Sequence, residues 1–81
     1  MTPAVPAYFE IIDFIASGTT PEAVVDFRPS PESQRRVAEL IERERDGTLS
    51  NAEKAELDHF MELKHIMRMA KAKARLILSR V

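Results

Sequence analysis

The stretch that most constrains the fold is the last one, residues 51–81, because it contains neither Pro nor Gly. Apolar residues recur in it with alternating spacings of three and four, which places them on one side of an α-helix. This spacing averages 3.5 residues, the period of a coiled coil. We therefore predict one long helix over residues 51–81 with an apolar seam formed by Phe60, Leu63, Met67, Ala70, Ala74, Ile77 and Val81.

A row of basic residues runs beside this seam. Lys64, Arg68, Lys71 and Arg75 fall within about 60° of one another on a helical wheel. Three interpretations stay open for the row: a solvated helix face, a contact with an acidic protein surface, or a contact with the phosphates of a nucleic acid. Together with Lys73, these residues form the predicted site for an acidic partner or a nucleic acid.

The charges of the chain are divided along its length. Residues 1–62 hold all 13 Asp and Glu and six of the 12 Lys and Arg, a net charge of −7. Residues 63–81 hold the other six basic residues and no acid, a net charge of +6. This division suggests an acidic partner, a nucleic acid, or a second copy docked head to tail.

Start and stop signals predict three shorter helices before the long one. Thr20-Pro21 and Ser30-Pro31 each place a capping side chain before a Pro at the first helical position. Gly18 and Gly47 stand where helices end, and Ser50 with Glu53 fits a capping box. The predicted helices cover residues 8–17, 21–27, 31–46 and 51–81.

These elements predict an all-α fold in a single domain over residues 1–81, with residues 1–6 as a disordered lead-in. The short connection 47–50 favours an antiparallel hairpin of the last two helices, with the two short N-terminal helices packed on it. The third helix covers only half of the fourth, so the part from about Met67 onward overhangs. Either the first two helices fold back along this overhang, or another chain covers it.

Composition and motifs argue against several classes of function. The chain has no Cys, no apolar run long enough for a membrane span and no signal peptide, so we expect a cytoplasmic protein. A single Glu-x-x-His, Glu62 to His65, is too little for a di-iron site, which needs two such motifs and two further Glu. No Ser lies in a nucleophile elbow, and two Gly do not make a phosphate loop. We expect no enzyme activity, cofactor, metal or small-molecule substrate.

Four segments resemble a known family. The run Gly47-Thr48-Leu49-Ser50-Asn51-Ala52-Glu53-Lys54-Ala55-Glu56-Leu57-Asp58 is followed by His65-Ile66-Met67-Arg68 and Ala70-Lys71-Ala72-Lys73-Ala74-Arg75. Together with Arg28-Pro29-Ser30, they are similar to a family of small uncharacterised bacterial proteins, often cyanobacterial, over about residues 8–78. Members of that kind look antitoxin-like and are commonly encoded beside a nuclease. The resemblance implies a chain that binds a protein such as a nuclease, and it assigns no residue roles.

The predicted function is a non-catalytic, antitoxin-like interaction module that uses the long helix. The seam has two interpretations: it packs inside the chain's own core, or it binds a partner protein or a second copy. In the second case the partner-binding residues are Phe60, Leu63, Met67, Ala70, Ala74 and Ile77. The alternative function is nucleic-acid binding through the basic row. Membrane binding by the amphipathic helix is a third and less favoured function, because the helix lacks Trp and its seam contains two Ala.

Overall fold

The computed structural model describes residues 6–80, and every regular element in that range is an α-helix. The helices are α1 (Phe9–Ala16), α2 (Pro21–Asp26), α3 (Pro31–Asp46) and α4 (Asn51–Ser79). The predicted all-α class is therefore confirmed. Val81 and nearly all of the predicted lead-in over residues 1–6 lie outside the described range. No helix within that range is long and apolar enough to cross a membrane.

Local capping fixes where the helices begin. The Thr20 hydroxyl accepts a hydrogen bond from the Ala23 amide at 3.2 Å, and the Ser30 hydroxyl accepts one from the Ser33 amide at 3.1 Å. Both caps are followed directly by a Pro, as predicted. The capping box at α4 is also confirmed, because the side chains of Ser50 and Glu53 each accept a hydrogen bond from the other's amide.

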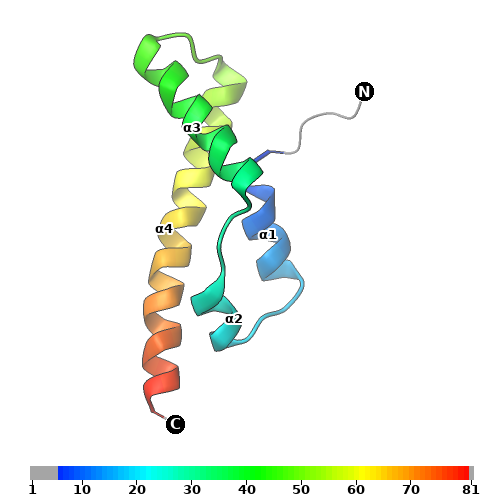
Figure 1. The fold of residues 1–81 in the computed structure, drawn as a ribbon, viewed down its shortest axis with the longest axis vertical. Helices are drawn as coiled ribbons and strands as arrows, with labels where there is room; N and C mark the ends of the chain where they lie inside the picture. The colour runs from blue at the N-terminus through cyan, green and yellow to red at the C-terminus, as the bar shows by residue number, and fades with distance from the viewer. Residues whose placement is uncertain (1–5, 81) are drawn as a thin grey trace.

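The long helix α4 is the axis of the molecule, which measures 49 × 28 × 18 Å. In Figure 1, α3 lies beside the first part of α4 and α2 lies beside its later part. Phe27, directly after α2, packs against Phe14 of α1 with the rings tilted by 39° and their centroids 4.6 Å apart. At the start of α1, Tyr8 meets His59 of α4 edge to face at 5.2 Å. The region after Met67, predicted to overhang, is therefore partly covered by the chain's own α2.

A small apolar core joins the N-terminal segment to α3 and α4. Leu40 is fully buried and Ile11 is 2 % exposed. The rest of this core consists of Ala7, Val37, Leu57, Phe60 and Met67. Half-buried Phe14, Val24 and Phe27 pack against its edge, which connects it to α2. On the wide apolar surface of α1, Ile11 is thus buried in the core, whereas Phe9, Ile12 and Ile15 remain exposed.

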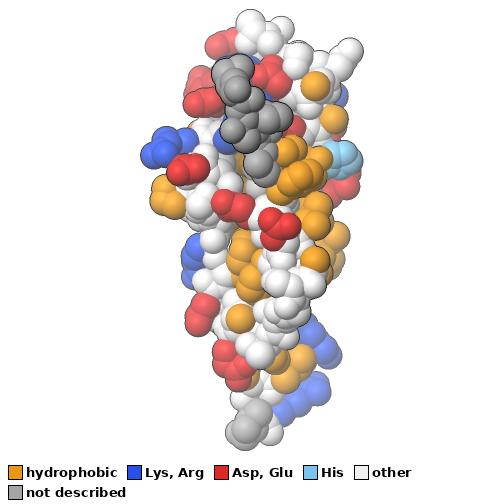
Figure 2. All heavy atoms as spheres, turned by 90° about the vertical axis from the view of Figure 1, so that its right-hand side faces the viewer, with side chains coloured by type: hydrophobic (Ala, Val, Ile, Leu, Met, Phe, Trp, Pro, Cys, Tyr) orange, Lys and Arg blue, Asp and Glu red, His pale blue; other side chains and the backbone are white. Residues whose placement is uncertain are grey.

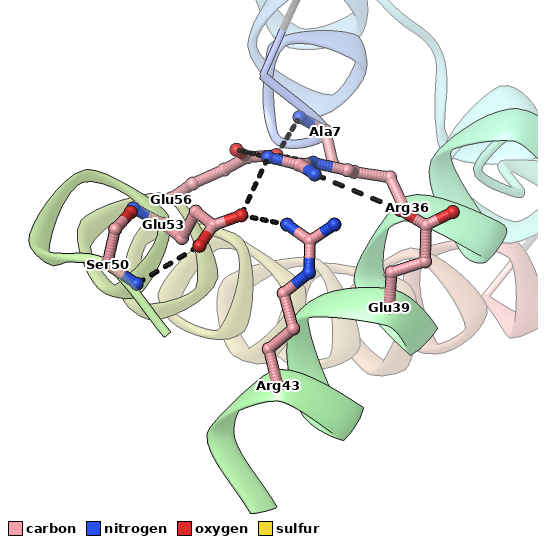
Figure 3. Close-up of polar contacts among 7 residues, drawn as sticks. All are labelled: Ala7, Arg36, Glu39, Arg43, Ser50, Glu53 and Glu56. Carbon is pink, nitrogen blue, oxygen red and sulfur yellow. Dashed lines mark hydrogen bonds and ion pairs between the residues drawn. The ribbon is translucent and has the colours of Figure 1, made fainter. Parts of the chain in front are cut away.

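Ion pairs and hydrogen bonds fasten α3 and the N-terminal segment to the first part of α4 (Figure 3). The Arg36 guanidinium donates to both oxygens of Glu56, at 3.2 and 3.0 Å. Glu56 also accepts from the Ala7 amide at 3.2 Å. Arg43 of α3 pairs with Glu53 of α4. These contacts lie at one end of α4 and do not involve its basic C-terminal part.

Candidate functional site

A groove with an apolar floor and a basic rim lies between α4, α3 and the connection that joins α2 to α3. Its volume is about 500 Å³, within the range typical of ligand sites. The floor is built from core and edge residues, including Ile11, Val37, Ile41, Phe60 and Met67. The rim carries Arg28, Lys64, Arg68 and Lys71. None of the described residues that line it is an Asp or a Glu, and we call this site the basic groove.

Two rim cations converge on the end of α2. The Lys71 ammonium donates to the Phe27 carbonyl at 2.7 Å, and the Arg28 guanidinium donates to the same carbonyl at 2.8 Å. Arg28 also donates to the Val25 carbonyl at 3.2 Å. Positive groups at a helix C-terminus complement its dipole, which explains why like charges can gather here. The contact of Lys71 also positions the α2–α3 connection against α4, and so forms one wall of the groove.

The electrostatics of the rim favour an added negative charge. Partial burial, followed by repulsion from Arg28 and Arg75, lowers the pKa of Lys71 below its ordinary value. Asp26 acts in the opposite direction but does not overcome these effects. An anion placed between Lys71 and Arg28 would reduce their mutual repulsion and stabilise the protonated lysine. The groove therefore suits a ligand with a carboxylate or phosphate beside an apolar group.

The structure brings together only part of the predicted basic set. Lys64, Arg68 and Lys71 line the groove, as side chains three and four residues apart on a helix should. Arg75 is exposed and influences Lys71 by charge, but does not line the groove. Lys73 lies about 200° around the helix from Lys71 and faces another side of α4. Arg28, from outside the long helix, was not predicted as a site residue and belongs to this rim.

The predicted seam is divided between the core and the surface. Phe60, Met67 and Ala74 are buried within the chain, at 4, 5 and 4 % exposure. Leu63 and Ala70 are half-buried, and Ile77 is exposed. The interpretation of the seam as intramolecular core therefore holds for Phe60, Met67 and Ala74. Among the seam residues that the structure describes, a partner that does not rearrange the fold meets Leu63, Ala70 and Ile77.

Another apolar surface is more accessible than the seam. Figure 2 shows a band of hydrophobic side chains down the α1 side of the molecule, with Lys and Arg side chains at its lower right. On α1 the exposed residues are Phe9, Ile12 and Ile15, and on α4 they are Met61, Ile66, Met69, Leu76 and Ile77. These side chains are exposed, but on α4 they do not all share one side, because Met61 lies about 140° around the helix from Ile66.

Comparison of the chain with protein-family models, curated proteins and solved structures finds no match to any of them.

Two further polar groups, His59 and Glu10, make local structural contacts. His59 lies edge to face against Tyr8, and the described part of the chain contains no group of three His, Asp or Glu placed to hold a metal ion. The Glu10 carboxylate is a capping group: it accepts hydrogen bonds from the Ser30 amide at 2.9 Å and the Ser30 hydroxyl at 2.5 Å. The basic groove is therefore the candidate site on which function is argued.

Proposed function

We propose that this chain is a non-catalytic protein-interaction module whose basic groove holds an acidic segment of a partner protein. Its scaffold in this proposal is the antiparallel hairpin of α3 and α4, with α1 and α2 packed on it. The observation that carries the proposal is the combination of four cations on the rim with an apolar floor and no lining carboxylate. Such a surface fits a segment that has apolar side chains for the floor and carboxylates for the rim.

The proposed role is antitoxin-like: the module binds a partner and restrains it. A nuclease is the partner to test first, since the sequence resemblance implies one. Nuclease sites bind phosphates and are surrounded by basic residues, so an acidic segment elsewhere on such a protein would be the part that enters the groove. Residues 1–62 carry a net charge of −7, and in this proposal their exposed carboxylates outside the groove face the partner's basic site.

The test compares two charge-reversed variants of the tagged chain as baits in the native host. Lys64→Glu with Arg68→Glu reverses one side of the groove, and Arg45→Glu is the control, because Arg45 is exposed and pairs only with Glu42 at the end of α3. The proposal expects a captured protein that is retained by wild type and Arg45→Glu and lost by the groove variant. Direct titration with the purified protein must reproduce this order. Equal capture by all three baits would contradict the proposal.

Nucleic-acid binding is the second candidate, and the closeness of Lys64, Arg68, Lys71 and Arg28 is the observation that favours it. It predicts that a labelled duplex or single strand binds at low salt and is released steeply as salt increases. The apolar floor has no role in phosphate contact, so this candidate depends on the rim cations alone, and Lys64→Glu with Arg68→Glu should abolish the binding. Absence of binding to both probes at low salt would remove this candidate.

A further inference from the structure

A second line of side chains on α4 has a spacing that reads the same from either end. Its members are Glu62, Ile66, Met69, Lys73, Leu76 and Arg80, separated by four, three, four, three and four residues. They fall within about 80° of one another on the helical wheel. All six are exposed, including Ile66 at 48 %, Met69 at 54 % and Leu76 at 46 %. This is coiled-coil spacing on the side of the helix that the chain itself leaves uncovered.

We infer that a second copy of the chain docks on this line, with the two α4 helices antiparallel. A two-fold axis beside residue 71 brings Ile66 of each copy against Leu76 of the other. The same axis places Met69 opposite Lys73, whose aliphatic stem covers the methionine while its ammonium reaches water. It also pairs Glu62 with Arg80 at both ends of the contact.

Charge decides the orientation of the two helices. In a parallel pair in register, Glu62 would face Glu62, Lys73 would face Lys73 and Arg80 would face Arg80 of the other copy. In the antiparallel pair, each end of the contact instead has one ion pair between Glu62 of one copy and Arg80 of the other.

The contact is long enough for a specific dimer when its flanks are included. From Glu62 to Arg80 the helix measures about 27 Å. Burying about 800 Å² on each copy, as stable interfaces do, requires neighbouring residues on both sides of the line. Ile77, 40 % exposed, lies on one flank of the line. Ile12 of α1, 41 % exposed, lines a shallow hollow with Glu62 and Leu63 at the end where the second copy's C-terminal turn would lie.

This surface is independent of the basic groove. Lys64 lies about 160° around the helix from the centre of the line, so a dimer leaves both grooves open on its outer sides. The proposed function and the dimer can therefore fail separately. The groove variant Lys64→Glu with Arg68→Glu is expected to dimerise normally.

Cysteine pairing tests the arrangement, since the chain has no Cys of its own. Positions 66 and 76 are about 15 Å apart along one helix, and a disulfide requires Cα atoms within about 7 Å. Under a glutathione redox buffer, a mixture of the Ile66→Cys and Leu76→Cys variants is expected to form a cross-linked heterodimer, while each variant alone remains uncross-linked. Cross-linking of each variant alone at the rate of the mixture would overturn the antiparallel pairing.

A charge exchange gives a second test in solution. Sedimentation equilibrium of the wild type is expected to show the mass of two 9.2 kDa chains. Glu62→Arg alone and Arg80→Glu alone should each raise the dimer dissociation constant about tenfold, because symmetry repeats each repulsion at two places. The double exchange should restore it, while Asp46→Arg, at the far end of α3, should leave it unchanged. A monomeric mass for the wild type at all concentrations, or no recovery in the double exchange, would overturn the inference.

Discussion

The Arg36 guanidinium and the Glu56 carboxylate form a two-pronged hydrogen-bonded pair that joins α3 to α4. Their side chains are 30 % and 14 % exposed, whereas those of the surface pair Lys54 and Asp58 are 62 % and 55 % exposed. A double-mutant cycle with Arg36→Met and Glu56→Gln is expected to show a coupling energy of about 1 kcal/mol. The glutamine still accepts from the Ala7 amide, so the cycle isolates the pair.

The matched control for this cycle is the exposed pair itself. Lys54→Met and Asp58→Asn should couple by about 0.3–0.5 kcal/mol, the value of an ordinary helix-surface pair. Urea unfolding followed by circular dichroism measures both cycles. Coupling between Arg36 and Glu56 no larger than that between Lys54 and Asp58 would contradict the structural role of the pair.

The fully buried Leu40 is expected to be the most sensitive position in the core. Leu40→Ala should cost about 2–5 kcal/mol, which approaches the whole stability of about 3–5 kcal/mol available to a domain of this size. The variant should therefore show little helical signal at physiological temperature. Met61→Ala, at a residue 40 % exposed, should retain the wild-type melting curve.

The Ser50 hydroxyl caps α4 and is expected to matter more than its exposure suggests. Ser50→Ala removes the acceptor for the Glu53 amide and should cost about 1 kcal/mol. For a chain of this length, that corresponds to a fall of about 4–8 °C in the melting temperature. The exposed Ser79 hydroxyl donates only to the Leu76 carbonyl, so Ser79→Ala should change stability by less than about 0.5 kcal/mol. Equal melting temperatures for both variants would argue against the cap.

Acid is expected to weaken the link between α1 and α3. Partial burial alone would raise the pKa of Glu10, but hydrogen bonds from Ser30 and Ser33 outweigh it and hold the pKa below its ordinary 4.5. The charged carboxylate thus stabilises the folded state fully above pH 4.5, and this contribution is lost as pH falls through the lowered value. Glu10→Gln should be less stable than wild type at neutral pH and equal to it in acid. Parallel stability curves for the two proteins across this range would refute the assignment.

Lys71→Met separates stability from binding. The substitution removes the hydrogen bond to the Phe27 carbonyl, but Arg28 still donates to that oxygen. It also removes a partly buried charge that Arg28 and Arg75 repel. These effects oppose each other, so the free energy of unfolding should change by no more than about 0.5 kcal/mol. The affinity for an acidic partner, in contrast, should fall. Loss of folding cooperativity in this variant would show that Lys71 mainly holds α2 in place.

The helix starts could be predicted from the sequence because their causes are local. Thr20, Ser30 and Ser50 each cap the helix that follows within three residues, so no knowledge of tertiary packing is required. Orientation around α4 is less accessible from periodicity. The spacing of Phe60, Met67 and Ala74 is the same whether a partner or the chain's own helices cover them. These three residues are buried within the chain itself because α2 and α3 pass over that side of α4.

The composition of the basic groove lay beyond the sequence for a related reason. Arg28 is 43 residues from Lys71 in the chain, and the two meet only because the α2–α3 connection passes beside α4. Charge alone groups Lys73 with the basic row, although helix geometry places it on another side of α4. The self-complementary line from Glu62 to Arg80 is visible in the sequence, but its exposure emerges only when the other side of α4 is covered.

The attachment of α2 has a consequence for the motions of the molecule. None of its six residues is buried, and Phe27 at its end supplies the aromatic and carbonyl contacts that hold it against Phe14 and Lys71. Such a segment opens locally at a lower free energy than global unfolding, and its amides should exchange hydrogen before those of α3. Because Arg28 and Pro29 follow directly, each opening of α2 also swings away one wall of the groove. A ligand that keeps the α2–α3 connection against α4 would therefore slow amide exchange in α2, although it contacts little of that helix.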